Sequence, residues 1–262
     1  MHYNTQIFIQ FTKRDIYVFS KNIIRYFINY SIIFPSLYAL TFGYIIPTTS
    51  FSNVQLVSIS LLLPSSLIFL FLSLNFNQNI FLLLDLENNK YIEFQTLLLN
   101  PRLLIIQKVF VTSSFTTIFL LPFFGVTKLI LQNSFDTSQL SIFKLVTIIF
   151  FSSIAAASYV ILSILYMHNT HQIGNWWRRM NTPLTMLGGT WVPWATMAKV
   201  SVILGYITLF NPFIYITEGL RGAILGTDLF IPFHYCILAL TIFTFIFINL
   251  AIRKFKKRLD CF

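Results

Sequence analysis

The chain has 262 residues, of which 56% are hydrophobic and only 10% are charged. In a soluble globular domain about a quarter of the residues are Asp, Glu, Lys or Arg. This composition therefore excludes a soluble domain and indicates an integral membrane protein. The formal net charge is +10, but the sequence has no nucleic-acid motif and no basic face interleaved with exposed aromatic residues, so we expect no nucleic acid among its partners.

The N-terminal segment predicts an amphipathic helix over residues 5–22, ahead of the first apolar stretch. Apolar side chains recur there among polar ones, as in helices that lie along the surface of a membrane. The other interpretation is a solvated leader that precedes the first span. The apolar positions are Ile7, Phe8, Phe11, Ile16, Val18 and Phe19.

Five segments are long and apolar enough to cross the hydrocarbon core of a bilayer, which takes about 20 residues. They cover residues 23–46, 54–74, 109–127, 145–167 and 233–252. We expect a sixth span at residues 183–200, followed by short re-entrant helices over residues 201–228. The sequence therefore predicts an all-α, polytopic membrane protein with six transmembrane helices, in a single domain that covers residues 1–262.

Residues 181–228 are apolar but repeatedly interrupted by glycine and proline. Irregular backbone at membrane depth is stable only where protein or a polar cavity covers it, which makes this region a candidate for function. The interruptions are Pro183, Gly188, Gly189, Pro193, Gly205, Asn211 and Pro212.

The distribution of basic residues orients the six spans. With both termini in the cytoplasm, only Lys128, Lys144, Lys199 and Arg221 of the 18 basic residues fall outside. This bias follows the positive-inside rule, and the cytoplasmic charges would face anionic lipids. We expect a bacterial plasma (inner) membrane as the location, with membrane lipids as partners.

A charged, helix-prone stretch interrupts the apolar chain between the second and third spans. Its charged and apolar side chains recur at helical spacing, and the residue before Pro101 is disfavoured from a helix, so a cytoplasmic helix is expected over residues 86–100. Taken alone, the stretch would also fit an ordinary surface loop. The residues that carry the pattern are Glu87, Lys90, Tyr91, Glu93 and Phe94.

Two stretches of the chain match a known pattern at the expected distance from one another. The first is LENNKYIEFQTLLLNPRLLIIQK, which holds Glu87, Pro101 and Lys108. The second is GGTWVPWATMAK followed by LFNPFIYITEGLRGAILG, with the order Asn-Pro-x-x-Tyr-x-x-Glu-x-x-Arg. With six spans and a preceding amphipathic helix, the chain resembles the ABC-2 type permeases, the membrane subunits of one class of ATP-binding-cassette exporter. The resemblance covers nearly the whole chain.

The resemblance implies that residues 86–100 form a coupling helix that docks on a separate ABC ATPase subunit. It also implies a second copy of the chain, although a heterodimer with a related permease fits as well, and export of an amphipathic, lipid-linked or glycan-type substrate. The chain has no Gly-Lys pair and hence no P-loop, so we expect a transport subunit without catalytic residues or a bound cofactor, with ATP and Mg held by the ATPase. The implied docking residues are Glu87, Lys90, Tyr91, Glu93, Phe94 and Pro101.

The interrupted region and its Glu-x-x-Arg pair are the candidate exit gate. Glu218 and Arg221 lie three residues apart and share a helical face, and an unpaired charge at membrane depth is costly, so they either pair or line an aqueous cavity. One interpretation is a polar gate for the substrate, and the other is a structural salt bridge that holds the re-entrant helix. The candidate residues are Gly188, Gly189, Pro193, Asn211, Pro212, Tyr215, Glu218 and Arg221.

Four residues precede the predicted span at residues 183–200 on the cytoplasmic side, namely Trp176, Trp177, Arg178 and Arg179. Trp and Arg residues at this depth are common interfacial anchors. They would also suit an anionic, lipid-linked substrate that enters from the inner leaflet.

Two further residue pairs lie before and after this cluster in the sequence. Trp191 and Trp194 flank Pro193 and fit either an outer aromatic belt or stacking on sugar rings. His168 and His171 have no Cys or carboxylate nearby in the sequence, so no metal site is expected.

Two other classes of function stay open at this point. A membrane-embedded lipid-modifying enzyme needs an acid, a base or a nucleophile, and the sequence shows no clustered aspartates and no metal-ligand set. A stand-alone ion-coupled carrier would have carboxylates in mid-span and broken helices in both halves. The five clear spans, however, contain no Asp or Glu.

Overall fold

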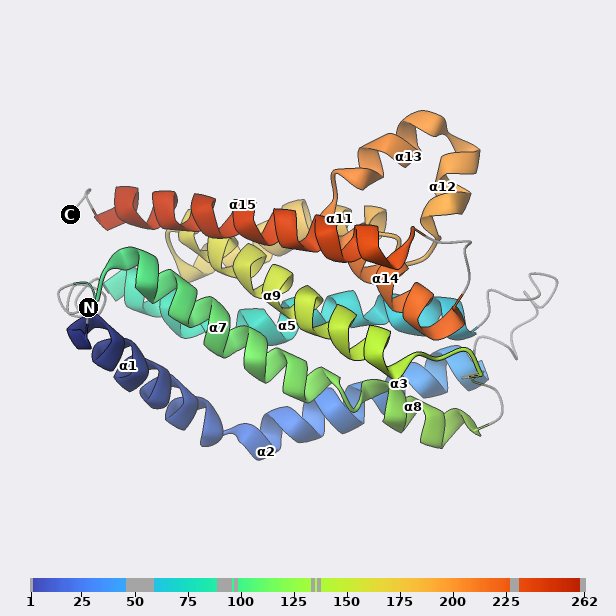
Figure 1. Ribbon diagram of the computed structural model, residues 1–262, viewed down its shortest axis with the longest axis horizontal. Helices are drawn as coiled ribbons and strands as arrows, with labels where there is room; N and C mark the ends of the chain where they lie inside the picture. The colour runs from blue at the N-terminus through green and yellow to red at the C-terminus, as the bar shows by residue number, and fades with distance from the viewer. Residues whose placement is uncertain are drawn as a thin grey trace.

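The computed structural model describes residues 2–45, 59–88, 96, 99–132, 135, 138–226 and 231–259. All regular structure in these residues is helical, with no strand among them. Most helices run along the long axis of the molecule, and α1 (His2–Ser20) begins at the end where α15 (Phe233–Leu259) finishes (Figure 1). The predicted all-α fold is therefore confirmed for the described part of the chain.

Long helices make up the first part of the chain, and shorter ones follow. The first apolar helix is continuous from residue 23 to 45 and contains α2 (Ile23–Tyr26), η1 (Phe27–Ile33), α3 (Phe34–Leu40) and η2 (Thr41–Ile45). Next come α5 (Ile59–Asn88), α7 (Pro101–Leu120), α8 (Phe123–Leu131) and α9 (Ile142–Tyr166). The short elements before α15 are η5 (Thr170–Gln172), α10 (Ile173–Trp176), η6 (Trp177–Asn181), α11 (Thr182–Leu187), α12 (Trp194–Val200), α13 (Val202–Leu209) and α14 (Pro212–Leu225).

Within the described residues, five helical stretches are long and apolar enough to cross a membrane, which makes the protein an integral membrane protein, as predicted. They are Ile23–Gly43, Leu62–Glu87, Pro101–Leu131, Ile142–Tyr166 and Phe233–Arg258. A sixth span arises only if α13 and α14, which are bent by 96° at the short break between them, count as one broken span.

The predicted span at residues 183–200 is not one helix. α11 ends at Leu187 and α12 begins at Trp194, and between them Gly189 has a φ of +76°. A residue in the left-handed region ends a helix, and Pro193 has no amide hydrogen with which to continue one. The prediction of a continuous helix is therefore wrong, and this break is the centre of the site described below.

The charged stretch differs from its prediction at its start. α5 continues to Asn88, so Glu87 belongs to the end of the second span and does not begin a separate helix. At the other end, the side chain of Asn100 caps α7 by accepting a hydrogen bond from the amide of Arg102 at 3.1 Å, and Pro101 is the first helical residue. The turn predicted near Asn100 is confirmed. The remaining predicted docking residues lie outside the described residues: Lys90, Tyr91, Glu93 and Phe94.

α9 is the central helix, and it packs against α5, α7, α14 and α15. Its middle holds a run of small buried residues, Ala155, Ala156 and Ala157, and small residues let helices approach closely in membranes. On α14, a Cβ added to Gly219 would lie 2.5 Å from Cδ1 of Ile148. This close packing fixes α14, which carries the charged pair of the site, against the core.

The predicted amphipathic helix is present as α1, and it packs against α7 (Figure 1). The carboxylate of Asp15 is buried, and its Oδ2 accepts hydrogen bonds from Nζ of Lys108 at 2.7 Å and from Nε2 of Gln107 at 2.9 Å. The Phe19 ring packs edge-on against that of Phe115. A displacement of α7 would therefore be transmitted to α1.

Candidate functional site

The site is built around the break between α11 and α12 at residues 188–193. The break leaves backbone carbonyl groups without helical partners, and each such group must be satisfied at membrane depth. Two of them are satisfied by α14: Oγ1 of Thr217 donates to the carbonyl of Gly188 at 2.8 Å, and Nη2 of Arg221 donates to that of Gly189 at 2.7 Å. The broken segment is thus held by side chains of a helix that follows it in the chain.

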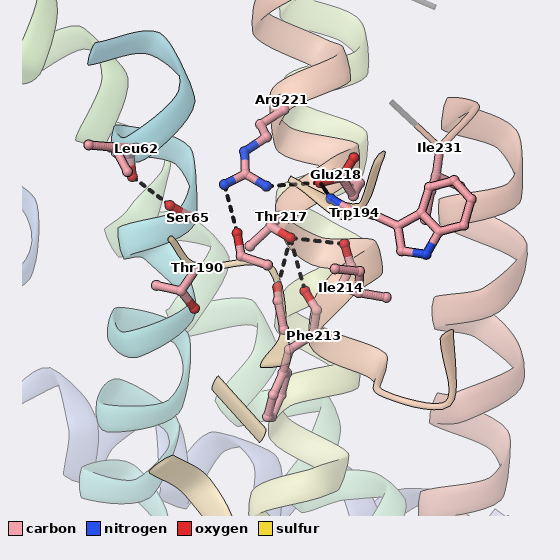
Figure 2. A network of polar contacts seen from close by, with 12 residues as sticks. Leu62, Ser65, Thr190, Trp194, Phe213, Ile214, Thr217, Glu218, Arg221 and Ile231 are labelled. Atoms are coloured by element: carbon pink, nitrogen blue, oxygen red, sulfur yellow. Dashed lines mark hydrogen bonds and ion pairs between the residues drawn. The ribbon is translucent and has the colours of Figure 1, made fainter. Parts of the chain in front are cut away.

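Glu218 and Arg221 form a fully buried ion pair in this network (Figure 2). Nη1 of Arg221 lies 2.8 Å from Oε1 of Glu218, and both side chains have 0% exposure. The same Oε1 accepts a hydrogen bond from the amide of Trp194, the first residue of α12, at 3.1 Å. The pair therefore joins α14 to the break and to the start of α12. Of the two interpretations of this pair, this geometry fits the structural salt bridge.

Asn211 connects the end of α11 with the start of α14. Its Nδ2 donates to the carbonyl of Leu184 at 2.6 Å, and its Oδ1 accepts from the amide of Phe213 at 3.0 Å. Pro212 occupies the first turn of α14, where its missing amide hydrogen costs nothing. Oη of Tyr215 donates to the carbonyl of Leu209 at 2.8 Å, across the bend between α13 and α14. The predicted gate residues thus act at two places. Glu218 and Arg221 stabilise the break, whereas Asn211 and Tyr215 stabilise the bend and its contact with α11.

We predict that Asn211→Ala lowers the free energy of unfolding by about 2 kcal/mol, because it removes a helix cap and a second buried hydrogen bond. Thermal unfolding in mild detergent measures the change. Asn249→Ala is the matched control, since Asn249 is partly exposed and its side chain donates back to the carbonyl of Phe245 in its own helix. Equal shifts in the two variants would contradict a bridging role for Asn211.

The predicted cytoplasmic cluster separates into two parts. The Trp176 ring stacks on that of Phe76 with centroids 6.0 Å apart, and the Trp177 ring meets that of Phe69 edge-on at 5.6 Å, so both tryptophans pack against α5. The side chains that follow them, Arg178 and Arg179, are exposed. The structure therefore does not gather these four residues into one binding site.

A cavity of about 260 Å³ lies beside the break, between the first apolar helix, α5 and the segment from η6 to residue 191. Among the residues singled out in the sequence, only Trp177 and Trp191 line it. Its other lining residues were not predicted, because serine, threonine and single aromatic residues scattered over three helices make no local pattern. They are Tyr38, Phe42, Leu62, Ser65, Ser66, Ile68, Phe69, Asn181, Thr182, Thr185, Met186 and Thr190.

Comparison of the chain with protein-family models, with curated proteins and with solved structures finds no match. Within the described residues, no three His, Cys, Asp or Glu side chains lie close enough to hold a metal ion. The site consists of a stabilised helix break and, next to it, a cavity with no charged side chain among its described lining residues.

Proposed function

We propose that the protein is the membrane permease subunit of an ABC-2 type exporter, which moves an amphipathic, lipid-linked or glycan-type substrate outward with ATP hydrolysed by a separate subunit. One observation carries the proposal. Residues of the Asn-Pro-x-x-Tyr-x-x-Glu-x-x-Arg stretch, through which the chain resembles these permeases, hold the interrupted segments in place. Glu218 and Arg221 bond to the two sides of the break, Asn211 bonds to α11, and Tyr215 bonds across the bend between α13 and α14.

The arrangement of α5, α7 and α1 supports a docking point for an ATPase. α5 ends at Asn88 and α7 begins at Pro101, both at the end of the bundle where α1 begins (Figure 1). A subunit that gripped the connection between them would push two spans at once, and the Asp15–Lys108 pair would carry the movement to α1. This is the mechanical role proposed for residues 86–100.

Two faces of the bundle support the proposed contacts with lipids and with a second copy of the chain. The spans Ile23–Gly43 and Phe233–Arg258 are the least buried, with 22% and 17% of their most apolar windows inside the molecule. Long apolar faces left open in this way are covered by acyl chains or by another helix in a membrane. A homodimer about an axis normal to the membrane uses such a face twice.

The test of the proposal is to purify the tagged chain from its native membrane in mild detergent and to identify its partners by mass spectrometry. We expect a stoichiometric partner that contains a P-loop. Repeated isolation of the chain alone, in a defined oligomer, would contradict the proposal.

A stand-alone ion-coupled carrier is the second candidate, and one observation favours it. Oε2 of Glu218 is buried and has no hydrogen-bond partner among the described residues, as expected of a carboxylate that takes up a proton or an ion at membrane depth. Isolation of the chain without an ATPase, together with transport driven by an ion gradient, would favour this function over the permease.

We predict that the charge reversals Glu87→Lys and Glu93→Lys, made together, lower the stimulation of the partner ATPase by tenfold or more while the chain stays inserted and folded. Like charges placed against each other in an interface cost several kcal/mol, and about 1.4 kcal/mol is tenfold in affinity. Asp260→Lys, which reverses a charge in the C-terminal tail, is the control. Unchanged complex formation in the double variant would contradict docking through residues 86–100.

A further inference from the structure

Among the described residues, no charged side chain lines the cavity between the first apolar helix, α5 and the α11 segment. A charged group placed there would lack an ion-pair partner at membrane depth, where this is costly, so the cavity fits an uncharged ligand. Aromatic rings from three segments border it. Phe69 lies 5.6 Å from Trp177, and Phe42 lies 6.5 Å from Trp191, measured between ring centroids. Such rings offer flat apolar faces for a ligand to pack on.

The lining also contains one hydrogen-bond donor without a partner. Asn181 is 1% exposed, and its Oδ1 accepts a hydrogen bond from Oη of Tyr159 at 3.0 Å. Its Nδ2 is buried and has no partner among the described residues. Buried polar atoms are nearly always paired, and an exception calls for an explanation. Asn181 lines the cavity, so an oxygen atom of a bound molecule would satisfy Nδ2 when the side chain turns this atom toward the cavity.

The hydroxyl groups of the lining offer the complementary function. Oγ of Ser65 donates to the carbonyl of Leu62 at 2.7 Å, and Oγ1 of Thr185 donates to that of Thr182 at 3.0 Å. A hydroxyl whose hydrogen is used in this way keeps lone pairs that accept hydrogen bonds. The cavity therefore presents acceptors for the hydroxyl groups of a ligand and one donor, from Asn181, for a ligand oxygen.

We propose that this cavity binds an uncharged, hydroxyl-rich amphiphile of the glycoside type, and that Asn181 is the residue that selects it. A glycoside supplies hydroxyl donors for Ser65 and Thr185, an oxygen acceptor for Asn181, and apolar faces for the aromatic rings. The inference rests on the proposed function only in naming this ligand as the exported substrate, because binding itself does not require the ATPase.

The experiment measures binding to the full chain alone, reconstituted in phosphatidylcholine nanodiscs. Octyl glucoside, below its micelle concentration, is the probe, and tryptophan fluorescence is the readout, since Trp177 and Trp191 line the cavity. Asn181→Leu is compared with Asn75→Leu. The control replaces another buried asparagine, on α5, in which Oδ1 rather than Nδ2 lacks a partner among the described residues and which does not line the cavity. Octyl sulfate, which carries an anionic head group on the same chain, tests the exclusion of charge, because a quaternary ammonium group would bind to the aromatic rings themselves.

We expect saturable binding of octyl glucoside that Asn181→Leu weakens about five- to tenfold, the effect of one lost hydrogen bond, and that Asn75→Leu leaves unchanged. We expect no saturable signal from octyl sulfate. Equal affinity for octyl glucoside in all three proteins, equal weakening in both variants, or saturable binding of octyl sulfate would each overturn the inference. None of these outcomes depends on whether an ATPase purifies with the chain, so failure here is distinct from failure of the proposed function.

Discussion

Arg221→Met is expected to lower the free energy of unfolding by about 3–5 kcal/mol, the effect of breaking a buried ion pair on one side. The loss arises because Glu218 would keep a charge with 0% exposure and no partner of opposite sign. The carbonyl of Gly189 would also lose its hydrogen bond from Nη2. Thermal and chemical unfolding in mild detergent measure the change.

The double variant Glu218→Gln with Arg221→Met is expected to be more stable than Arg221→Met alone. Replacing both charges removes the unpaired carboxylate, and a glutamine oxygen can still accept from the amide of Trp194. Lys108→Met serves as a comparison, since the Lys108–Asp15 pair is similarly short, at 2.7 Å, but Lys108 is 17% exposed. Asp15 is buried but keeps its hydrogen bond from Gln107, so we expect a smaller loss, of about 1–3 kcal/mol.

These variants also separate the two interpretations of the charged pair. If the pair is the structural salt bridge, Arg221→Met loses stability and transport together, and the double variant recovers part of both. A pair that acts as a polar gate would give an Arg221→Met protein with unchanged unfolding and impaired transport. The single variant Glu218→Gln completes the comparison. A stability loss in the double variant equal to the sum of the losses in Glu218→Gln and Arg221→Met would contradict direct pairing.

Much of the fold could be predicted because the main signal in a membrane protein is local. A stretch such as Ile142–Tyr166 is long and apolar enough to be recognised from composition alone. Each of the five clear spans overlaps one of the observed apolar helices, although the start of the predicted span at residues 54–74 lies outside the described residues. Their ends were less predictable, because helices continue past the apolar core when polar side chains find partners. α5, for example, runs through Asn75 and Asn79, which donate to carbonyl groups one turn earlier in the same helix.

The break at residues 188–193 could not be predicted from local sequence patterns alone. Gly188, Gly189 and Pro193 were recognised as interruptions, yet hydropathy alone favours a continuous span at residues 183–200. What stabilises the break comes from elsewhere in the chain, since Arg221 reaches the carbonyl of Gly189 across 32 residues of sequence. The glycines reveal that the helix can break there, whereas the tertiary contacts decide that it does.

The cavity was unpredictable for a related reason. Its donor, Asn181, lies in an ordinary polar stretch and becomes distinctive only because Tyr159 pairs with its oxygen and leaves its nitrogen unpaired. The signal that could have been used is weak: Thr182 and Thr185 repeat at a helical spacing in an apolar region. Hydroxyl groups at this spacing occur in many membrane helices, where they donate to their own backbone.

Gly189→Ala is expected to destabilise the protein by about 3 kcal/mol. Gly189 has a φ of +76°, where a residue with a Cβ atom pays about 1–2 kcal/mol. The added Cβ would lie 2.7 Å from Cδ1 of Ile214 and 2.8 Å from Oγ1 of Thr217, and overpacking of this kind adds about 1–3 kcal/mol. Gly222→Ala is the control, because a Cβ there meets nothing within 4 Å and alanine favours a helix by up to about 1 kcal/mol.

The same substitution tests whether the break and the charged pair form one unit. A Cβ on Gly189 displaces Thr217 and moves the carbonyl to which Arg221 donates. Gly189→Ala and Arg221→Met therefore remove overlapping contacts, and we expect the combined loss of stability to be smaller than the sum of the two. Strict additivity would mean that the two residues act independently. Gly222 lies one position beyond Arg221 on α14. The stability change from Gly222→Ala should add to that from Arg221→Met without coupling.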